Sequence, residues 1–134
     1  MPQDVVLEIK VIKRFIAKEK QDRYIQFVSS RKNRHKFIKD LAHFKFLNWD
    51  LFIPVKKNEE QLILNTLRQN NLPDKTCYVI SEYRDIDTKT MDIKAAIKEA
   101  VGNGMGTILV FGDAEMILFE GEEMNTRYIS KIVT

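Results

Sequence analysis

Four short segments in the C-terminal half most strongly limit what this chain can fold into. Residues 77–82, 107–111 and 116–120 are predicted to be strands, because each is short, apolar and rich in β-branched or aromatic residues. Residues 91–101 carry apolar side chains at helical spacing. The order strand, helix, strand predicts a right-handed parallel unit, and a tight hairpin at residues 112–115 then leads into the third strand.

The N-terminal half is predicted to be mainly helical. The spacing of apolar residues predicts helices over residues 4–18, 31–44 and 58–69. A short extended piece at residues 51–53 precedes Pro54, which argues against a central strand, and residues 127–133 are predicted to form a last edge strand. The predicted fold is therefore one mixed α/β (α+β) domain. N-terminal helices pack on a small mixed sheet of three to five strands with one crossover helix.

Charge divides this predicted domain into a basic helical part, residues 1–72, and an acidic sheet-forming part, residues 73–134. Residues 1–55 hold 12 Lys and Arg against 6 Asp and Glu, a net charge of +6. Residues 56–134 hold 10 against 13, a net charge of −3. Such segregation predicts an electrostatic partner surface, either for nucleic acid or for a second copy of the chain in a homodimer.

Composition excludes several classes of protein. The chain has no apolar run of membrane-spanning length, and its first residues lack the pattern of a signal peptide, so no membrane association is expected. Cys77 is the single cysteine, which rules out an internal disulfide and a cysteine-ligated zinc site within one chain. These features favour a cytoplasmic protein, and no motif calls for a cofactor.

The glycine-rich segment at residues 102–106 is the first candidate site. A phosphate-binding glycine loop leads from a strand into a helix, whereas this segment leads from a helix into a strand and lacks the Lys-Ser/Thr of a P-loop. A helix C-cap with a tight turn is the favoured interpretation. Three glycines in five residues exceed what one cap needs, so close approach of a ligand or partner backbone stays open.

Polar residues at predicted strand ends form the second candidate. Glu82 and Glu120 each end a strand, and two converging carboxylates can hold Mg²⁺ or act as acid and base. Their strands are predicted to be antiparallel, which would place the two ends at opposite edges, so solvated carboxylates are favoured. Ser81 also ends a strand but lacks the Gly-x-Ser-x-Gly elbow of a hydrolase. The candidate ligand-binding residues are Ser81, Glu82, Gly104, Gly106, Glu120 and Glu122.

A cationic stripe on the predicted helix 31–44 is the strongest binding feature. Lys32, Arg34, Lys36 and Lys39 are the candidate nucleic-acid-binding residues, because cations at this density can neutralise several phosphates. The alternative is a solvated helix face whose cations pair with acidic groups of the same molecule or of a partner. This alternative is favoured over nucleic-acid binding. His35 and His43 are eight residues apart, too far to share a metal ion on one helix, so no metal site is predicted.

The C-terminal half resembles a family of small uncharacterised bacterial proteins. The resemblance is carried by Tyr78-Val79-Ile80-Ser81, Gly104-Met105-Gly106-Thr107 and Phe119-Glu120-Gly121-Glu122, a YVIS…GxGT…(F/Y)EGE pattern. This chain has Gly112-Asp113 where the family pattern has a Pro-Gly turn, so its hairpin is expected to differ. The resemblance implies no activity and adds interest to Ser81, Glu82, Gly106, Glu120 and Glu122.

Three functions follow as hypotheses. The leading one is a non-enzymatic cytoplasmic binding or accessory protein, because the known catalytic constellations are absent from the sequence while charge is segregated. The second is a nucleic-acid-binding protein that uses the basic helix 31–44. The third is a metal-dependent hydrolase, which requires at least two of the acidic strand ends to converge in a cleft.

Overall fold

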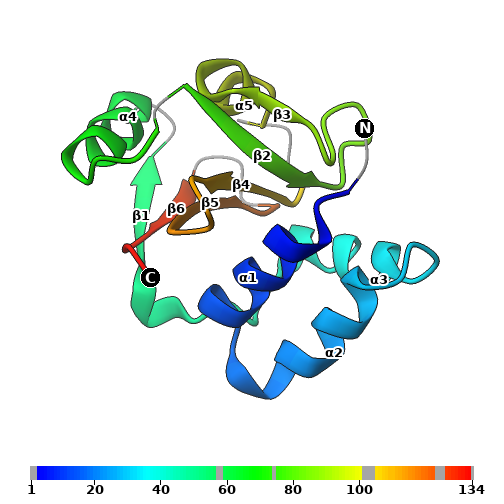
Figure 1. Cartoon of the computed structure of the whole chain (residues 1–134). Coiled ribbons are helices and arrows are strands. Elements are labelled where there is room, and N and C mark those ends of the chain that lie inside the picture. The colour runs from blue at the N-terminus through cyan, green and yellow to red at the C-terminus, as the bar shows by residue number, and fades with distance from the viewer. Residues whose placement is uncertain (1–2, 57–58, 74, 101–104, 123–125, 134) are drawn as a thin grey trace.

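The described residues form one six-stranded sheet with helices on both faces (Figure 1). The computed structural model describes residues 3–56, 59–73, 75–100, 105–122 and 126–133. The strands are β1 (Phe52–Lys56), β2 (Thr76–Ser81), β3 (Thr90–Asp92), β4 (Thr107–Phe111), β5 (Met116–Glu120) and β6 (Thr126–Ser130). Their order across the sheet is β1-β6-β5-β4-β2-β3, and every pairing is antiparallel.

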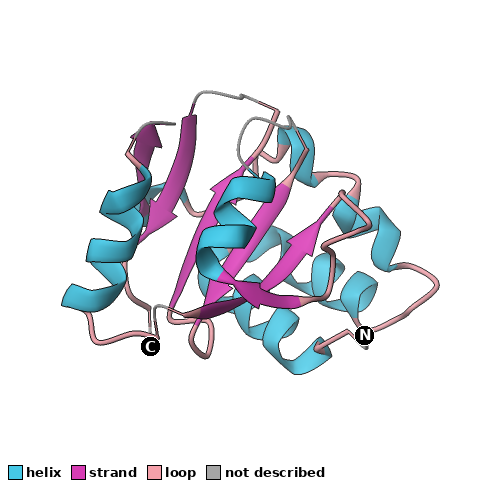
Figure 2. Cartoon of the chain, turned by 90° about the horizontal axis from the view of Figure 1, so that it is seen from above, coloured by secondary structure: helices cyan, strands magenta, loops and turns pink. Residues whose placement is uncertain are grey.

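The helices divide between the two faces of the sheet. They are α1 (Val5–Phe15), α2 (Lys18–Val28), α3 (Arg34–Ile38), α4 (Glu60–Gln69) and α5 (Ile93–Ala100), with 3₁₀ turns η1 (Leu41–His43) and η2 (Trp49–Leu51). Helices α1, α2 and α3 cover one face, and α4 and α5 cover the other (Figures 1 and 2). The predicted mixed α/β class is confirmed. None of the described helices is both long enough and apolar enough to cross a lipid bilayer.

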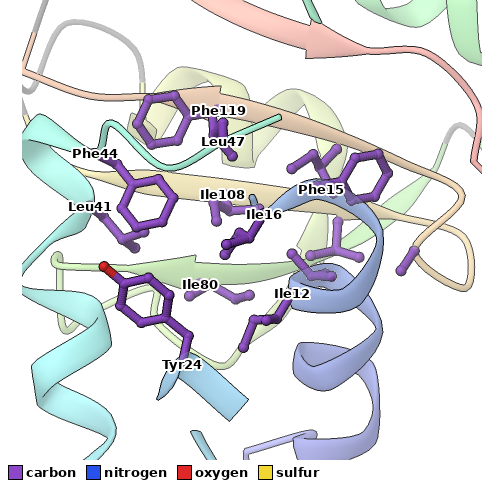
Figure 3. Close-up of a cluster of buried hydrophobic side chains, with 14 of the residues drawn as sticks. Ile12, Phe15, Ile16, Tyr24, Leu41, Phe44, Leu47, Ile80, Ile108 and Phe119 are labelled. Atoms are coloured by element: carbon purple, nitrogen blue, oxygen red, sulfur yellow. The ribbon is translucent and has the colours of Figure 1, made fainter. Parts of the chain in front are cut away.

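Each face of the sheet contributes to its own apolar core. In β2, Tyr78 and Ile80 join the core beneath α1–α3, while Cys77 and Val79 join the core beneath α4 and α5. Alternate side chains of a strand point to opposite faces, so a strand covered on both faces must be apolar throughout. Figure 3 shows the first core, where side chains of α1 and of the η1 region meet the strands. Full burial of each large apolar side chain contributes about 1.5–3 kcal/mol.

A side-chain cap at the start and an extended residue at the end determine the bounds of helix α1. The Asp4 carboxylate accepts a hydrogen bond from the backbone N–H of Leu7 at 3.0 Å and caps the helix. The helix ends at Phe15 rather than at the predicted residue 18, because Ile16 becomes extended and pairs with Leu47 in an isolated bridge. Helix α2 is therefore a separate element that packs against α1.

The predicted parallel unit is wrong, because the sheet contains a strand that the sequence pattern did not indicate. Residues 90–92 form β3, which pairs with β2, and helix α5 then begins at Ile93. Strand β4 also pairs antiparallel with β2, with Val79 opposite Leu109. Strands β3 and β4, the two neighbours of β2, are therefore parallel to each other. Helix α5 connects them and crosses over β2, which lies between them. The sheet is purely antiparallel, with six strands rather than three to five.

Other predicted boundaries also shift. The predicted helix 31–44 is reduced to α3 and η1, because the Leu41–His43 turn packs against the strand ends described below. The extended piece becomes β1, which includes Pro54 and lies at the sheet edge, where a missing N–H is tolerated. Strand β6 ends at Ser130, although Val133 N–H still bonds to the Glu115 carbonyl at 2.8 Å.

Candidate functional site

Four buried polar side chains form a row across neighbouring strands at one edge of the sheet. Ser81 lies opposite Thr107, and Thr107 lies opposite Glu120. Strand β6 adds Arg127, whose Nη2 donates to Glu120 Oε1 at 3.2 Å. All four residues are at most 2% exposed. The predicted separation of Glu82 and Glu120 to opposite edges is therefore wrong. Two successive antiparallel pairings make β2 and β5 parallel, so both strands end at the same edge.

The hydrogen bonds of this row hold the fold together rather than leaving a group free to react. The Ser81 and Thr107 hydroxyls are 2.7 Å apart, and the Tyr83 N–H donates to Ser81 Oγ at 3.0 Å. Among the described contacts, the Ser81 hydroxyl is bonded to Thr107 and to the Tyr83 N–H, and no histidine is hydrogen-bonded to it. Arg127 and Glu120 neutralise each other, which offsets part of the large cost of burying either charge alone.

Glu82 and Gly106 bind each other reciprocally. The Glu82 N–H donates to the Gly106 carbonyl at 3.0 Å, and the Gly106 N–H donates to Glu82 Oε1 at 2.6 Å. A Cβ on Gly106 would lie 2.3 Å from the carbonyl carbon of Leu41. The close approach that the glycines suggested is thus made by a turn of the chain itself. Gly104 lies outside the described residues.

Glu122 is the only one of the described candidate ligand-binding residues with an exposed side chain. Its backbone N–H donates to the Ala42 carbonyl at 2.6 Å, and a Cβ on the preceding Gly121 would lie 2.7 Å from that oxygen. Its Oε2 lies 4.0 Å from His43 Nδ1, an ion pair when His43 is protonated. Both side chains are about two-thirds exposed, so their charges remain available to a ligand.

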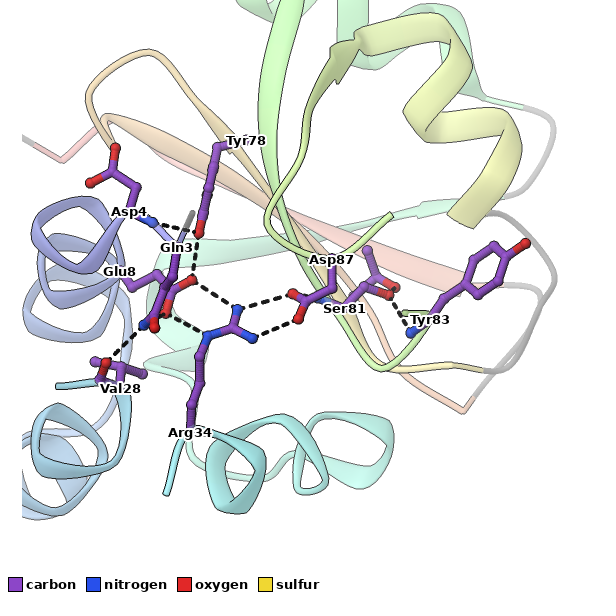
Figure 4. Close-up of polar contacts among 10 residues, drawn as sticks. Gln3, Asp4, Glu8, Val28, Arg34, Tyr78, Ser81, Tyr83 and Asp87 are labelled. Carbon is purple, nitrogen blue, oxygen red and sulfur yellow. Dashed lines mark hydrogen bonds and ion pairs between the residues drawn. The ribbon is translucent and has the colours of Figure 1, made fainter. Parts of the chain in front are cut away.

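The four candidate cations separate into two groups. Lys32, Lys36 and Lys39 are exposed, whereas the Arg34 side chain is 11% exposed. Arg34 donates to the Glu8 carboxylate at 2.8 Å and to the Asp87 carboxylate at 2.6 Å (Figure 4). Burial opposes its charge, but these hydrogen bonds more than offset that effect and raise the pKa of Arg34 above its ordinary value. The positive charge of Arg34 is therefore paired with two carboxylates of the same chain.

A cleft lined by aromatic side chains lies beside Glu122, and we refer to it as the aromatic cleft. Its volume is about 250 Å³, and its lining consists of Ala42, His43, Phe44, Lys45, Trp49, Phe119, Gly121, Glu122 and Tyr128. Phe119 and Tyr128 are cross-strand neighbours on β5 and β6. The Trp49 ring contacts both, with centroid distances of 6.5 Å to Phe119 and 5.0 Å to Tyr128.

The tryptophan of this cleft is both fixed and accessible. Its Nε1–H donates to the Lys45 carbonyl at 3.3 Å, while 41% of the residue stays exposed. Lys45 adds a cation at the rim, His43 adds a second one when it is protonated, and Glu122 adds an anion. An exposed tryptophan and a partly buried tyrosine beside convergent polar groups are typical of binding sites rather than of solvated surface.

The sequence interpretation missed Trp49 and Tyr128 as site residues. It treated the first as part of a connection and the second as part of an edge strand. One signal was present for Trp49, because the only tryptophan of the chain lies between Asn48 and Asp50 in a segment with no helical or strand period. Tyr128 gave no such signal, since an aromatic residue is ordinary in a strand.

Neither a metal centre nor a reactive thiol is found in the described part of the chain. The described residues contain no group of three His, Cys, Asp or Glu side chains placed to hold a metal ion. Burial, reinforced by the nearby Asp92, raises the pKa of the Cys77 thiol to about 12. At neutral pH this cysteine is therefore a protonated core residue, because only the thiolate is nucleophilic.

Comparison of the chain with protein-family models, curated proteins and solved structures finds no match. The resemblance to a family of small bacterial proteins therefore stays a prediction.

Proposed function

We propose that this protein is a non-enzymatic binding protein whose ligand occupies the aromatic cleft. The observation that carries the proposal is the half-exposed Trp49, held against Tyr128 above Phe119 in a cleft with charged groups at its rim. Small-molecule sites are concave and carry a few polar groups that orient the ligand, and this cleft combines aromatic side chains with such polar groups.

The hydrogen bonds of the predicted site residues favour a binding role over a catalytic one. Ser81 bonds to Thr107, Glu82 to Gly106 and Glu120 to Arg127, so each takes part in holding the strand ends together. The hydrolase hypothesis needs converging carboxylates with room for a cation. Glu82 and Glu120 do share an edge, but their described contacts are with protein groups.

A second candidate function is nucleic-acid binding through the basic segment. The observation that favours it is the exposure of Lys32, Lys36 and Lys39 around α3. Lys36 lies with its Nζ 5.7 Å from the centre of the Phe27 ring, next to the cations of α2. The measurement that decides this candidate is the salt dependence of binding to single-stranded DNA.

The ligand proposal is tested with small aromatic probes, because Trp49 is the only tryptophan and reports directly on the cleft. We expect benzyl alcohol and adenine to bind saturably, seen as a change in Trp49 emission and as saturation transfer in ligand-observed NMR. Replacing Tyr128 by Leu should weaken binding roughly 5- to 100-fold, because loss of one stacking face costs about 1–3 kcal/mol.

The matched control is Tyr83→Leu, which removes a tyrosine that does not line the aromatic cleft. This variant should bind both probes like the unchanged protein. The proposal fails if neither probe binds at millimolar concentration, or if the two tyrosine variants lose affinity equally. Thermal melting of each variant shows whether a loss of binding comes from unfolding.

A further inference from the structure

We infer that the ligand of the aromatic cleft is a nucleobase that carries a phosphate group, the base stacking on Trp49 beside Tyr128 and the phosphate meeting Lys45 and His43. The inference rests on the proposed function, since it names the chemical class of ligand for the same cleft. Three observations carry it: the angles between the rings, the polar atoms that are already occupied, and the charges at the rim.

The ring geometry favours a flat ligand over a compact cation. Trp49 meets Tyr128 at 75° and Phe119 at 80°, edge against face. At a centroid distance of 5.0 Å, Trp49 and Tyr128 touch each other and leave no gap for an ammonium group between them. A cage for a quaternary ammonium needs its ring faces around the cation, and Lys45 in the same lining would repel one. Trp49 is 41% exposed, so part of its indole stays accessible to a planar ligand.

The occupied indole N–H argues against an extended peptide. Proline-rich peptides have no internal backbone hydrogen bonds, so a groove that binds them satisfies their free carbonyls with donors. The natural donor in this cleft is Trp49 Nε1–H, which is already bonded to the Lys45 carbonyl. Stacking on the ring face, in contrast, needs no donor and leaves that bond intact.

The rim charges match the two polar parts of a nucleotide. Lys45 is exposed and free to approach a phosphate, and His43 becomes a second cation when protonated. Glu122 offers an acceptor that an exocyclic amino group of a base can reach. A volume of about 250 Å³ lies just below the usual range of small-molecule sites, about 300–1,000 Å³, so the cleft suits a single base rather than a larger ligand.

The test compares ligands that differ by one feature, with Trp49 emission as the readout. Adenosine tests the base, 5′-AMP adds the phosphate, and a hexamer of adenylate presents the same chemistry within a single strand. We expect 5′-AMP to bind roughly fivefold more tightly than adenosine, the size of one partly exposed ion pair. Lys45→Ala should remove that advantage, so that 5′-AMP and adenosine bind this variant equally. The Lys45 carbonyl that holds Trp49 is a backbone group and survives the substitution.

The matched control is Lys94→Ala, which removes an exposed lysine of α5 on the opposite face of the sheet. It should change neither affinity. If the hexamer binds more tightly than 5′-AMP and loses affinity steeply with salt, the source of the ligand is a single strand. If 5′-AMP binds as tightly as the hexamer, the source is a free nucleotide. Both outcomes support a base with a phosphate.

Other outcomes overturn the inference, and they separate it from the proposed function. Binding of benzyl alcohol that neither adenosine nor 5′-AMP displaces would keep the cleft as a binding site and reject the nucleotide class. Equal affinities for adenosine and 5′-AMP, or an unchanged preference in Lys45→Ala, would reject the phosphate assignment. Failure of every probe, benzyl alcohol included, would reject the proposed function and this inference together.

Discussion

The guanidinium of Arg34 lies between two carboxylates from distant parts of the chain. Glu8 comes from α1 and Asp87 from the turn between β2 and β3, so one side chain ties the helical layer to the sheet (Figure 4). The Tyr78 hydroxyl donates to Glu8 Oε2 at 2.7 Å, and the Asp87 carboxylate accepts from the Ser81 N–H at 3.0 Å. Every charged group in this cluster is therefore paired, as burial requires.

Removing the central charge should be costly. We expect Arg34→Met to lower the free energy of unfolding by about 3–5 kcal/mol, because it leaves the buried Glu8 carboxylate without a cation. Lys32→Met removes an exposed cation two residues away and should change stability by no more than about 0.5 kcal/mol. Urea unfolding followed by circular dichroism measures both values. Equal stabilities for the two variants would mean that the cluster contributes nothing.

The same residue shows the limit of sequence reasoning about single side chains. Helical spacing placed Lys32, Lys36 and Lys39 outward, and they are exposed. The density of cations in this segment, rather than helical spacing, counted Arg34 among the surface cations, and its side chain is only 11% exposed. Arg34 points inward because the Glu8 and Asp87 carboxylates lie beside it. The positions of those two carboxylates are set only by tertiary packing.

At the scale of elements, two glycines allow the η1 turn to lie directly on the strand ends. Gly106 at the start of β4 faces the Leu41 backbone, and Gly121 after β5 faces the Ala42 carbonyl. Side chains at these positions would collide with backbone that cannot move aside. This packing also positions Ala42 and His43 in the wall of the aromatic cleft.

We expect Gly106→Ala to cost about 1–3 kcal/mol of stability, the usual range for overpacking, and to shift the emission of native Trp49 by displacing the turn. Gly112→Ala is the matched control. Gly112 has φ +61°, so alanine there is strained by about 1–2 kcal/mol, but the nearest atoms belong to the flexible Glu115 side chain. It should leave Trp49 emission unchanged. A shifted spectrum in the control alone would contradict the assignment.

Sequence patterns predicted the long elements better than the short ones. The continuous apolar runs of β2 and β4 predicted buried neighbouring strands, and the structure pairs Val79 with Leu109. The direction of that pairing was wrong because β3, with three residues, is too short to carry a detectable period. Strand β3, which the sequence pattern did not predict, reverses the direction of the chain before α5. As a result β4 pairs antiparallel with β2, whereas a parallel pair was expected. That reversal also brings Ser81 and Glu120 to one edge.

At the scale of the whole molecule, residues 1–55, which include the basic layer of α1–α3, carry a net charge of +6, whereas residues 56–134 carry a net charge of −3. If the basic layer binds nucleic acid, its exposed lysines carry the interaction. Replacing Lys32, Lys36 and Lys39 by Ala should then weaken binding to single-stranded DNA and reduce the slope of log affinity against log salt by about 2–3, roughly one for each cation lost.

The control for this prediction makes the same change of charge elsewhere. Lys89, Lys94 and Lys98 are exposed and belong to the β2–β3 turn and α5, outside the basic layer. Their replacement by Ala should leave the slope unchanged if the basic layer is the interface. Electrophoretic or anisotropy titrations at several salt concentrations measure it. Equal losses in the two triple variants would show that net charge alone drives binding.

Sequence by itself determined the class of this fold, since apolar periodicity is a local property that each segment carries wherever it packs. It also determined that no internal disulfide can form and that charge is segregated along the chain. Tertiary structure alone decided strand direction, the inward position of Arg34 and the meeting of Trp49 with Tyr128. Arg34 meets carboxylates 26 and 53 positions away, Trp49 meets a residue of the last strand, and strand direction depends on a strand too short to detect. Such contacts exist only once the layers have packed.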